Sequence, residues 1–203
     1  MGQFPRRAAL AASLAVAAIL GGCATTYVSP VDVTRFVGSD PALLGTGPVA
    51  VRAGQGMDPQ SLEYSVFQTA VAEQLADVGY IVVGGDAPQV AEITVRRSVA
   101  HPGRGRSPVN VGVGGSAGSY RPRVGVGLGV GLNLAGAPAD RVNTELRVMI
   151  RPSAGGSALW EGRANFSATV NSRMADAQAS ASKLAQALFA GFPGRSGETI
   201  QVR

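Results

Sequence analysis

Apolar residues recur at helical spacing in two stretches of the chain. In the first, Asp58 is a suitable N-cap, Pro59 suits the first turn and Gly79 suits the end of a helix. The residues of one face of this helix are Leu62, Val66, Phe67, Ala70, Val71, Leu75 and Val78. Residues 175–192 predict a second amphipathic helix, with Ala181, Leu184, Ala185, Leu188 and Phe189 pointing inward. We expect Leu75 and Leu188 to be buried against a sheet.

Other stretches alternate apolar and polar residues, which predicts β-strands. Ser153 to Gly156 joins two of them as a hairpin turn, and the last stretch is predicted as an edge strand. The predicted strands cover residues 31–36, 48–53, 80–85, 91–101, 141–152, 157–170 and 198–203. Half-buried strands combined with two one-sided helices predict an α+β fold, a two-layer sandwich with a mostly antiparallel sheet.

A Gly/Val-rich insert at 102–136 interrupts this pattern and predicts a further β-hairpin. Its second arm, residues 124–134, alternates Val or Leu with Gly over 11 residues, about the length of a membrane-spanning β-strand. The favoured interpretation is a hairpin whose glycine face lets a helix or loop pack closely. The alternative is a ring closed by several subunits, as in the curli-type lipoprotein channels, because one hairpin alone would expose unpaired amides to lipid. At its turn, Tyr120, Arg121 and Arg123 suit contact with an anionic surface.

The first 22 residues have the pattern of a secretory signal peptide. Arg6 and Arg7 form a short positive region, and Ala8 to Leu20 is an apolar run of 13 residues, too short for a transmembrane helix. Gly21 and Gly22 supply the small side chains that a signal peptidase needs. The sequence therefore predicts export and removal of residues 1–22.

The cleavage region Leu20-Gly21-Gly22-Cys23 resembles the lipobox of bacterial lipoproteins. The resemblance implies cleavage between Gly22 and Cys23, diacylglycerol on the Cys23 sulfur and acylation of the new amine by a chain such as palmitate. Two or three acyl chains anchor a protein stably, whereas one binds only marginally. Ala24 after the cysteine favours sorting to the outer membrane. The alternatives are a buried or unpaired thiol, or a general secretory signal followed by a coincidental cysteine.

Composition limits what the exported part can be. Residues 23–47 are predicted as a tether, and residues 48–203 form one domain with a hydrophobic core. A single cysteine excludes a disulfide framework, and a single histidine excludes a zinc cluster. The formal net charge of +5 falls by two when Arg6 and Arg7 are removed. Partners expected for an exported basic chain are the membrane, anionic envelope polymers or another envelope protein, and no nucleic acid.

Motifs with catalytic associations lack their required context. Gly114 to Gly118 matches a G-x-S-x-G nucleophile elbow, and Gly112 to Ala117 matches a loose dinucleotide pattern, but no helix is predicted after either. His101 lies upstream and is predicted as a loop residue, accompanied by no carboxylate and no second ligand. Trp160, in an alternating strand, is predicted as core. We therefore expect no enzyme activity, no cofactor and no metal.

The order of elements resembles a family of small proteobacterial envelope lipoproteins that carry a domain of unknown function. The residues that carry the resemblance are a helix ending in Gly79-Tyr80, a strand, Trp160-x-Gly162 in a hairpin strand and a helix ending in Phe192-Pro193. The resemblance covers about residues 48–203 and implies a fold and a location. The sequence thus predicts an outer-membrane-anchored periplasmic lipoprotein with a non-enzymatic structural or binding role. The alternative is a subunit of an oligomeric secretion channel built from the glycine-rich hairpin.

Overall fold

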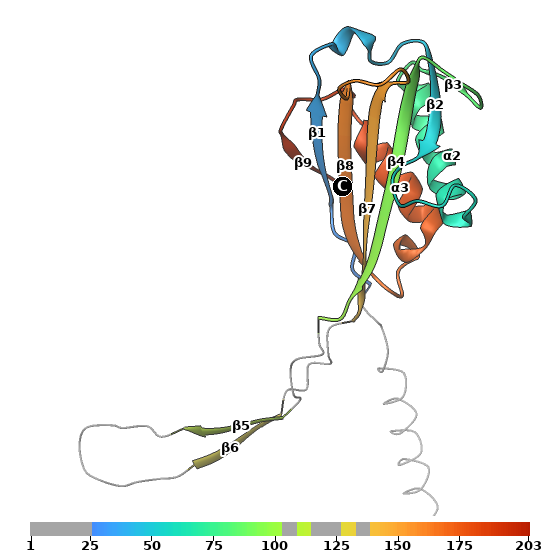
Figure 1. The fold of residues 1–203 in the computed structure, drawn as a ribbon. Coiled ribbons are helices and arrows are strands. Elements are labelled where there is room, and N and C mark those ends of the chain that lie inside the picture. The colour runs from blue at the N-terminus through green and yellow to red at the C-terminus, as the bar shows by residue number, and fades with distance from the viewer. Residues whose placement is uncertain (1–25, 103–108, 115–126, 133–138) are drawn as a thin grey trace, which may run out of the picture.

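A seven-stranded sheet forms one layer of the protein, and two helices on one of its faces form the other (Figure 1). The computed structural model describes residues 26–102, 109–114, 127–132 and 139–203. The helices are α2 (Leu62–Asp77) and α3 (Ala177–Phe189), with short 3-10 turns η1 (Pro41–Leu43) and η2 (Arg173–Ala175). The strands are β1 (Val31–Val37), β2 (Pro48–Ala53), β3 (Ile81–Val83), β4 (Gln89–Ala100), β5 (Val109–Gly114), β6 (Gly127–Leu132), β7 (Arg141–Pro152), β8 (Trp160–Thr169) and β9 (Thr199–Val202). The predicted α+β sandwich is confirmed.

The strand order is β3-β2-β4-β7-β8-β1-β9. Neighbours from β4 to β9 are antiparallel, whereas β2 runs parallel to both β3 and β4. Helix α2 connects β2 to β3, which is the crossover that a parallel pair requires. The strands β3 and β9 lie at the two edges, so the expectation of a C-terminal edge strand is confirmed.

Helix α2 begins later than its sequence pattern predicts. Its N-cap is Ser61, whose hydroxyl oxygen accepts a hydrogen bond from the Tyr64 amide at 3.1 Å. Asp58 is not the cap, because its carboxylate accepts a bond from the Gln60 amide in the preceding turn. Leu62 was expected to face inward, but it is the first residue of α2 and is 85% exposed. Tyr64 is buried in its place.

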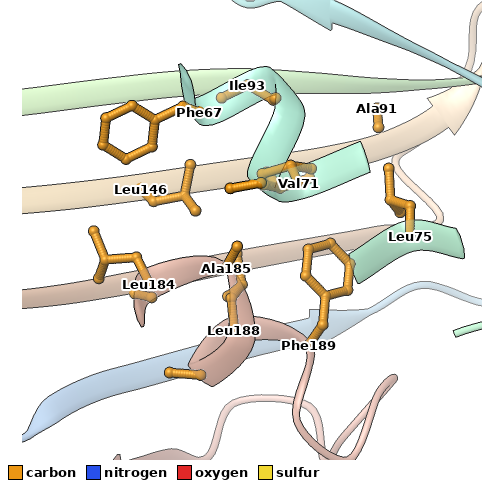
Figure 2. Packing of buried hydrophobic residues seen from close by; sticks show 14 of the residues in the cluster. Phe67, Val71, Leu75, Ala91, Ile93, Leu146, Leu184, Ala185, Leu188 and Phe189 are labelled. Atoms are coloured by element: carbon orange, nitrogen blue, oxygen red, sulfur yellow. The ribbon is translucent and has the colours of Figure 1, made fainter. Parts of the chain in front are cut away.

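The core lies between the two helices and the sheet (Figure 2). Leu75 and Leu188 are both fully buried, as expected. Each sheet strand contributes alternate residues to this core, which is why period-two patterning predicted the strands well. Buried residues of this core, from both helices and from the strands, include Phe67, Val71, Ile93, Leu146, Val148, Ile150, Ala164, Leu184 and Ala185.

One arginine enters the core from β1 and holds the end of α3. Arg35 is 5% exposed, and its Nε donates to the Leu188 carbonyl oxygen at 2.9 Å. Its Nη2 donates to the carbonyl oxygens of Ala187 at 2.9 Å and Ala190 at 2.8 Å. A guanidinium suits this place because the last carbonyls of a helix lack partners and carry partial negative charge. Burial lowers the pKa of Arg35, and the nearby Glu198 carboxylate opposes that change.

The Trp-x-Gly pattern has a packing cause. Trp160 is fully buried, so its assignment to the core is confirmed, and its indole N–H donates to the Pro193 carbonyl at 2.9 Å. A Cβ on Gly162 would lie 2.2 Å from the Trp160 ring, so the indole can lie there only over a glycine. Trp160 also stacks on Phe189 with ring centroids 5.4 Å apart, and Phe192 lies 5.2 Å from it.

The Gly-Tyr pattern joins the same aromatic cluster from the other helix. Gly79 has φ +105, and a Cβ there would lie 2.5 Å from the Gly45 carbonyl oxygen, so the chain can turn there only with glycine. The turn brings Tyr80 edge-on to Phe192 at 6.3 Å between centroids. The three sequence patterns, at 79–80, 160–162 and 192–193, therefore meet around one cluster.

The sheet begins earlier than the domain boundary expected at residue 48. Val31 to Val37 forms β1, which pairs with both β8 and β9 inside the sheet. Val31 and Val33 are fully buried because they alternate toward the helices. The segment 23–47 is therefore not a tether over its whole length, although the first strand expected at 31–36 is confirmed.

The glycine-rich insert contains a hairpin, as expected. Strands β5 and β6 pair with each other in a separate two-stranded sheet. Their register places Val111 opposite Val130 and Gly112 opposite Gly129. Apolar positions and glycine positions therefore fall on opposite faces of this hairpin.

Candidate binding surface

Both helices lie on one face of the seven-stranded sheet and leave the other face uncovered (Figure 1). The residues that the strand register places on this uncovered face are mostly polar. Its residues alternate along each strand with the buried ones. We call it the open face; its central members are Arg52 on β2, Glu92, Thr94, Arg96 and Ser98 on β4, Asn143, Glu145, Arg147, Met149 and Arg151 on β7, Glu161, Arg163, Asn165 and Ser167 on β8, and Asp32 and Thr34 on β1.

Diagonal ion pairs organise the centre of the open face. Arg147 on β7 lies directly opposite Arg163 on β8, an arrangement that repels by like charge. Arg147 Nη2 instead approaches Glu161 Oε1 at 2.9 Å, and Arg163 Nε lies 3.8 Å from Glu145 Oε1. Both pairs connect β7 to β8, along parallel diagonals. The paired arginines are therefore held close to the sheet with their charges largely balanced.

A third ion pair continues the pattern from β7 toward β2. Arg151 on β7 donates to the Glu92 carboxylate on β4, and this hydrogen bond raises the pKa of Arg151. Arg52 on β2 forms a further pair with Asp86, with 2.9 Å between Nη2 and Oδ1. Arginine provides a planar set of donors suited to carboxylate and phosphate groups. The open face thus offers several guanidinium groups on a rigid sheet.

A hollow of about 380 Å³ lies on the open face beside these pairs. Its polar lining comes from three neighbouring strands, β4, β7 and β8. Within it, the Ser167 hydroxyl donates to Asn143 Oδ1 at 2.5 Å. The side chains that line it from the open face are Arg96, Ser98, Asn143, Glu145, Asn165 and Ser167. Amide, hydroxyl and guanidinium groups together can bind a ligand rich in hydroxyl and carboxylate groups.

Sequence reasoning missed this surface. None of its residues belongs to a catalytic motif, and β4 is separated in the chain from the hairpin of β7 and β8 by the insert. The available signal was the polar half of each alternating strand, in particular Asn143, Glu145 and Arg147 within 141–152. That signal identifies an exposed face, but it does not say which strands are neighbours.

Most predicted site residues lie outside the described residues. This applies to the cleavage site at Gly22 and Cys23, and to Tyr120, Arg121 and Arg123 at the hairpin turn. Of the nucleophile-elbow match, only Gly114 is described, as the last residue of β5. In the described part of the chain no group of three or more His, Cys, Asp or Glu side chains gathers as metal ligands would.

His101 does have a carboxylate beside it, contrary to expectation. Its Nδ1 lies 2.7 Å from Oδ2 of Asp140. The two residues are far apart in sequence, but β4 ends and β7 begins at the same end of the sheet, where Ala100 pairs with Arg141. The loop position of His101 is confirmed. The His101–Asp140 pair links the end of β4 to the start of β7, on either side of the insert.

A second hollow, of about 350 Å³, lies between α2 and the edge formed by β2 and β3. Its lining is mixed, with Gln68, Thr69 and Glu73 on the helix and Val51, Val82 and Val83 on the strands. It carries no arginine and one acidic group. The open face is therefore the stronger candidate for binding a charged polymer. Within the described ranges, no helix has the length and apolar character needed to cross a membrane.

Comparison with known proteins gives one relative by sequence. No family model matches the chain. The protein is 31% identical over 217 residues to the uncharacterized protein ZMO1243 of Zymomonas mobilis, and the alignment covers 86% of this chain and 80% of that protein.

Solved structures show more distant likeness. A PDZ domain protein from Parabacteroides distasonis is 14% identical with a TM-score of 0.46, covering 95% of this chain and 42% of that one, so this chain spans less than half of it. A PelC dodecamer from Paraburkholderia phytofirmans is 12% identical with a TM-score of 0.42, covering 82% of this chain and 99% of that one. Both scores lie below 0.5, and neither likeness carries information on function.

Proposed function

For this chain, which belongs to the same family as the uncharacterized protein ZMO1243 of Zymomonas mobilis, we propose the role of an outer-membrane-anchored periplasmic lipoprotein. Its role is binding and not catalysis. The anchor is Cys23, and the open face of the sheet binds an anionic polymer of the cell envelope. The observation that carries the binding part is the hollow on the open face, lined by guanidinium, amide and hydroxyl groups.

The anchor is supported by the start of the chain. A positive region, an apolar run and two glycines precede the only cysteine. Acylation at the N-terminus would leave the folded domain exposed to the periplasm, since the sheet begins at Val31, eight positions after Cys23. The open face and its hollow then remain free for a polymer, because the two helices occupy only the opposite face.

Fractionation of cells tests the anchor. The variant Cys23→Ser should remain as unprocessed precursor or become soluble, because no sulfur is left to accept diacylglycerol. The matched variant Ala24→Asp keeps the cysteine and should move the protein toward the inner membrane. If Cys23→Ser fractionates with the outer membrane as the wild type does, the anchor is wrong.

Binding to purified peptidoglycan sacculi tests the open face. The variant Arg96→Glu places a negative charge in the hollow and should weaken binding by roughly tenfold or more, since a hydrogen bond to a charged group is worth about 1.5–3 kcal/mol. The control Arg195→Glu makes the same charge change at an exposed loop position after α3. Equal weakening by both variants would indicate nonspecific attraction and contradict a site on the open face.

A second candidate, the channel subunit, is favoured by the register of the insert. Strands β5 and β6 align apolar positions with each other and glycine positions with each other, except that Asn110 lies opposite Gly131. A ring of such hairpins would have an apolar face toward lipid and a glycine face toward a lumen.

The substitution Gly127→Glu separates the two candidates. We expect a non-conducting monomer with lowered thermal stability. The sequence predicts that a helix or loop packs closely on the glycine face, and a side chain forced into such packing costs about 1–3 kcal/mol. A stable ring that conducts ions in planar bilayers would favour the channel.

A further inference from the structure

One end of the seven-stranded sheet carries an exposed apolar cluster, which we call the apolar end. It consists of Tyr27, Val28, Val99 and Val170, with 43%, 37%, 52% and 50% of their surfaces exposed. These are four of the eight large hydrophobic residues exposed in the described part of the chain. The rest are scattered singly over other elements, which is ordinary for a protein surface.

The pairing of the sheet brings these residues together. Val28 forms a bridge to Ala168 on β8, which pairs with Val142 on β7, and Val142 pairs with Val99 on β4. This row of apolar residues lies on the helix side of the sheet, at its insert-bearing end. Val170 follows directly after β8, and its amide donates to the Asp140 carbonyl at 3.0 Å.

The apolar end also carries a tyrosine and an arginine in contact. The Arg141 guanidinium carbon lies 4.4 Å from the centre of the Tyr27 ring. Tyrosine is enriched where a membrane meets water, because its ring is apolar and its hydroxyl polar. Arginine can bind phosphate groups while its stem lies along apolar surface. The register that places Val142 on the helix side places Arg141 on the open face, so this pair and the valines lie on the two sides of the same end of the sheet. Together they match the chemistry of the lipid headgroup region.

The short stretch of chain between Cys23 and the sheet indicates that the apolar end contacts the lipid surface. Tyr27 follows Cys23 by four positions, and four residues span at most about 14 Å. The opposite end, where Ile81 pairs with Pro48, is separated from the apolar end by the 12 residues of β4, roughly 35 Å or more. An acylated Cys23 can therefore reach the membrane only with the apolar end nearest to it.

We propose that the apolar end lies against the lipid surface, with its valines and Tyr27 in the headgroup region and the strands rising away from the membrane. This inference rests on the proposed anchor at Cys23. It orients the open face sideways to the membrane, where a polymer parallel to the membrane could reach it. It also places the base of the insert, at His101 and Asp140, next to the lipid.

Quenching by brominated lipids tests the contact. The acylated chain is purified from envelopes and reconstituted in vesicles of phosphatidylcholine and phosphatidylglycerol brominated near the headgroups. The only native tryptophan, Trp160, is fully buried and provides the background emission. In the variant Val170→Trp, the fluorescence that the introduced tryptophan adds to that of Trp160 should be mostly quenched in brominated vesicles. Ile81→Trp, a 62% exposed position at the opposite end, should keep it.

Two further measurements distinguish a failure of the membrane contact from a failure of the proposed anchor. Val99→Trp reports on the same end from β4, so a misfolded Val170 variant does not decide the outcome. The intact mass of each sample reports the acyl chains. Acylated protein with no quenching at either 99 or 170 overturns the membrane contact and leaves the anchor in place. Protein without acyl chains contradicts the anchor itself and removes the premise of the contact.

Discussion

Arg35 and Arg163 lie on neighbouring strands, on opposite faces of one sheet, and their surroundings differ completely. Arg35 is buried under α3, where three carbonyl oxygens accept its hydrogen bonds. Arg163 lies on the open face, half exposed, with one carboxylate at 3.8 Å. The same residue type thus stabilises the fold on the covered face and is available to a ligand on the open face. The two faces should respond to mutation in different ways.

The largest loss of stability is expected on the covered face. Leu75→Ala or Leu188→Ala leaves a cavity in the fully buried layer between helices and sheet, and each should lower the free energy of unfolding by about 2–5 kcal/mol. Leu62→Ala is the matched control, because Leu62 is 85% exposed, and it should stay within about 0.5 kcal/mol. Urea denaturation measures all three. A stable Leu188→Ala protein would contradict the two-layer core.

The substitution Arg35→Met should lower the free energy of unfolding by a smaller amount. The apolar side chain fills much of the space but leaves the carbonyls of Ala187, Leu188 and Ala190 without their donor. A buried acceptor left unpaired costs about 1–3 kcal/mol. Arg163→Met makes the same change on the open face and should cost far less. Equal midpoints in urea for the two variants would show that the faces do not differ as described.

High pH should weaken the covered face selectively. Burial raises the pKa of Tyr80 and of Tyr64 above the ordinary value near 10, because the charged phenolate is disfavoured in the core. The folded protein therefore holds these protons more tightly than the unfolded chain. This stability is fully present below about pH 10 and is lost as pH rises through the raised values. Thermal unfolding between pH 8 and 11 measures it, and Tyr80→Phe should reduce the dependence.

The smallest effect is expected for an ion pair on the open face. Glu161→Gln removes the partner of Arg147, and exposed pairs contribute about 0–1 kcal/mol. The variant should unfold almost as the wild type does, but it frees a guanidinium and should strengthen binding to anionic sacculi. Unchanged binding together with a large loss of stability would assign the open face to folding and not to binding.

Local patterns predicted the helices and strands well, because each side chain in them faces either core or water. Residues 48–53 and 141–152 are strands with the bounds expected, and the inward face of α3 is correct. The helix start at Ser61 was missed because Asp58 and Pro59 give an equally good local signal. The choice between them depends on where the sheet ends beneath α2.

Features that depend on strand order were not predictable from one sequence. The hollow on the open face combines Arg96 on β4 with Asn143 and Asn165 on the hairpin of β7 and β8. The hairpin was expected from the sequence, but the pairing of β4 with β7 across the insert was not. The pairing of His101 with Asp140 has the same cause. The inward position of Arg35 contradicts the usual meaning of a charged residue in an alternating strand, and only the carbonyls at the end of α3 explain it.

The central claim is the lipid anchor, and the mass of one peptide tests it most directly. Tryptic digestion of the denatured envelope protein should release the peptide that starts at Cys23 and ends at Arg35. If Cys23 carries the anchor, the mass of this peptide is increased by diacylglycerol and by an N-terminal acyl chain, and no form begins before Cys23. A peptide that retains residues before Cys23, or one that carries a free thiol, would contradict it.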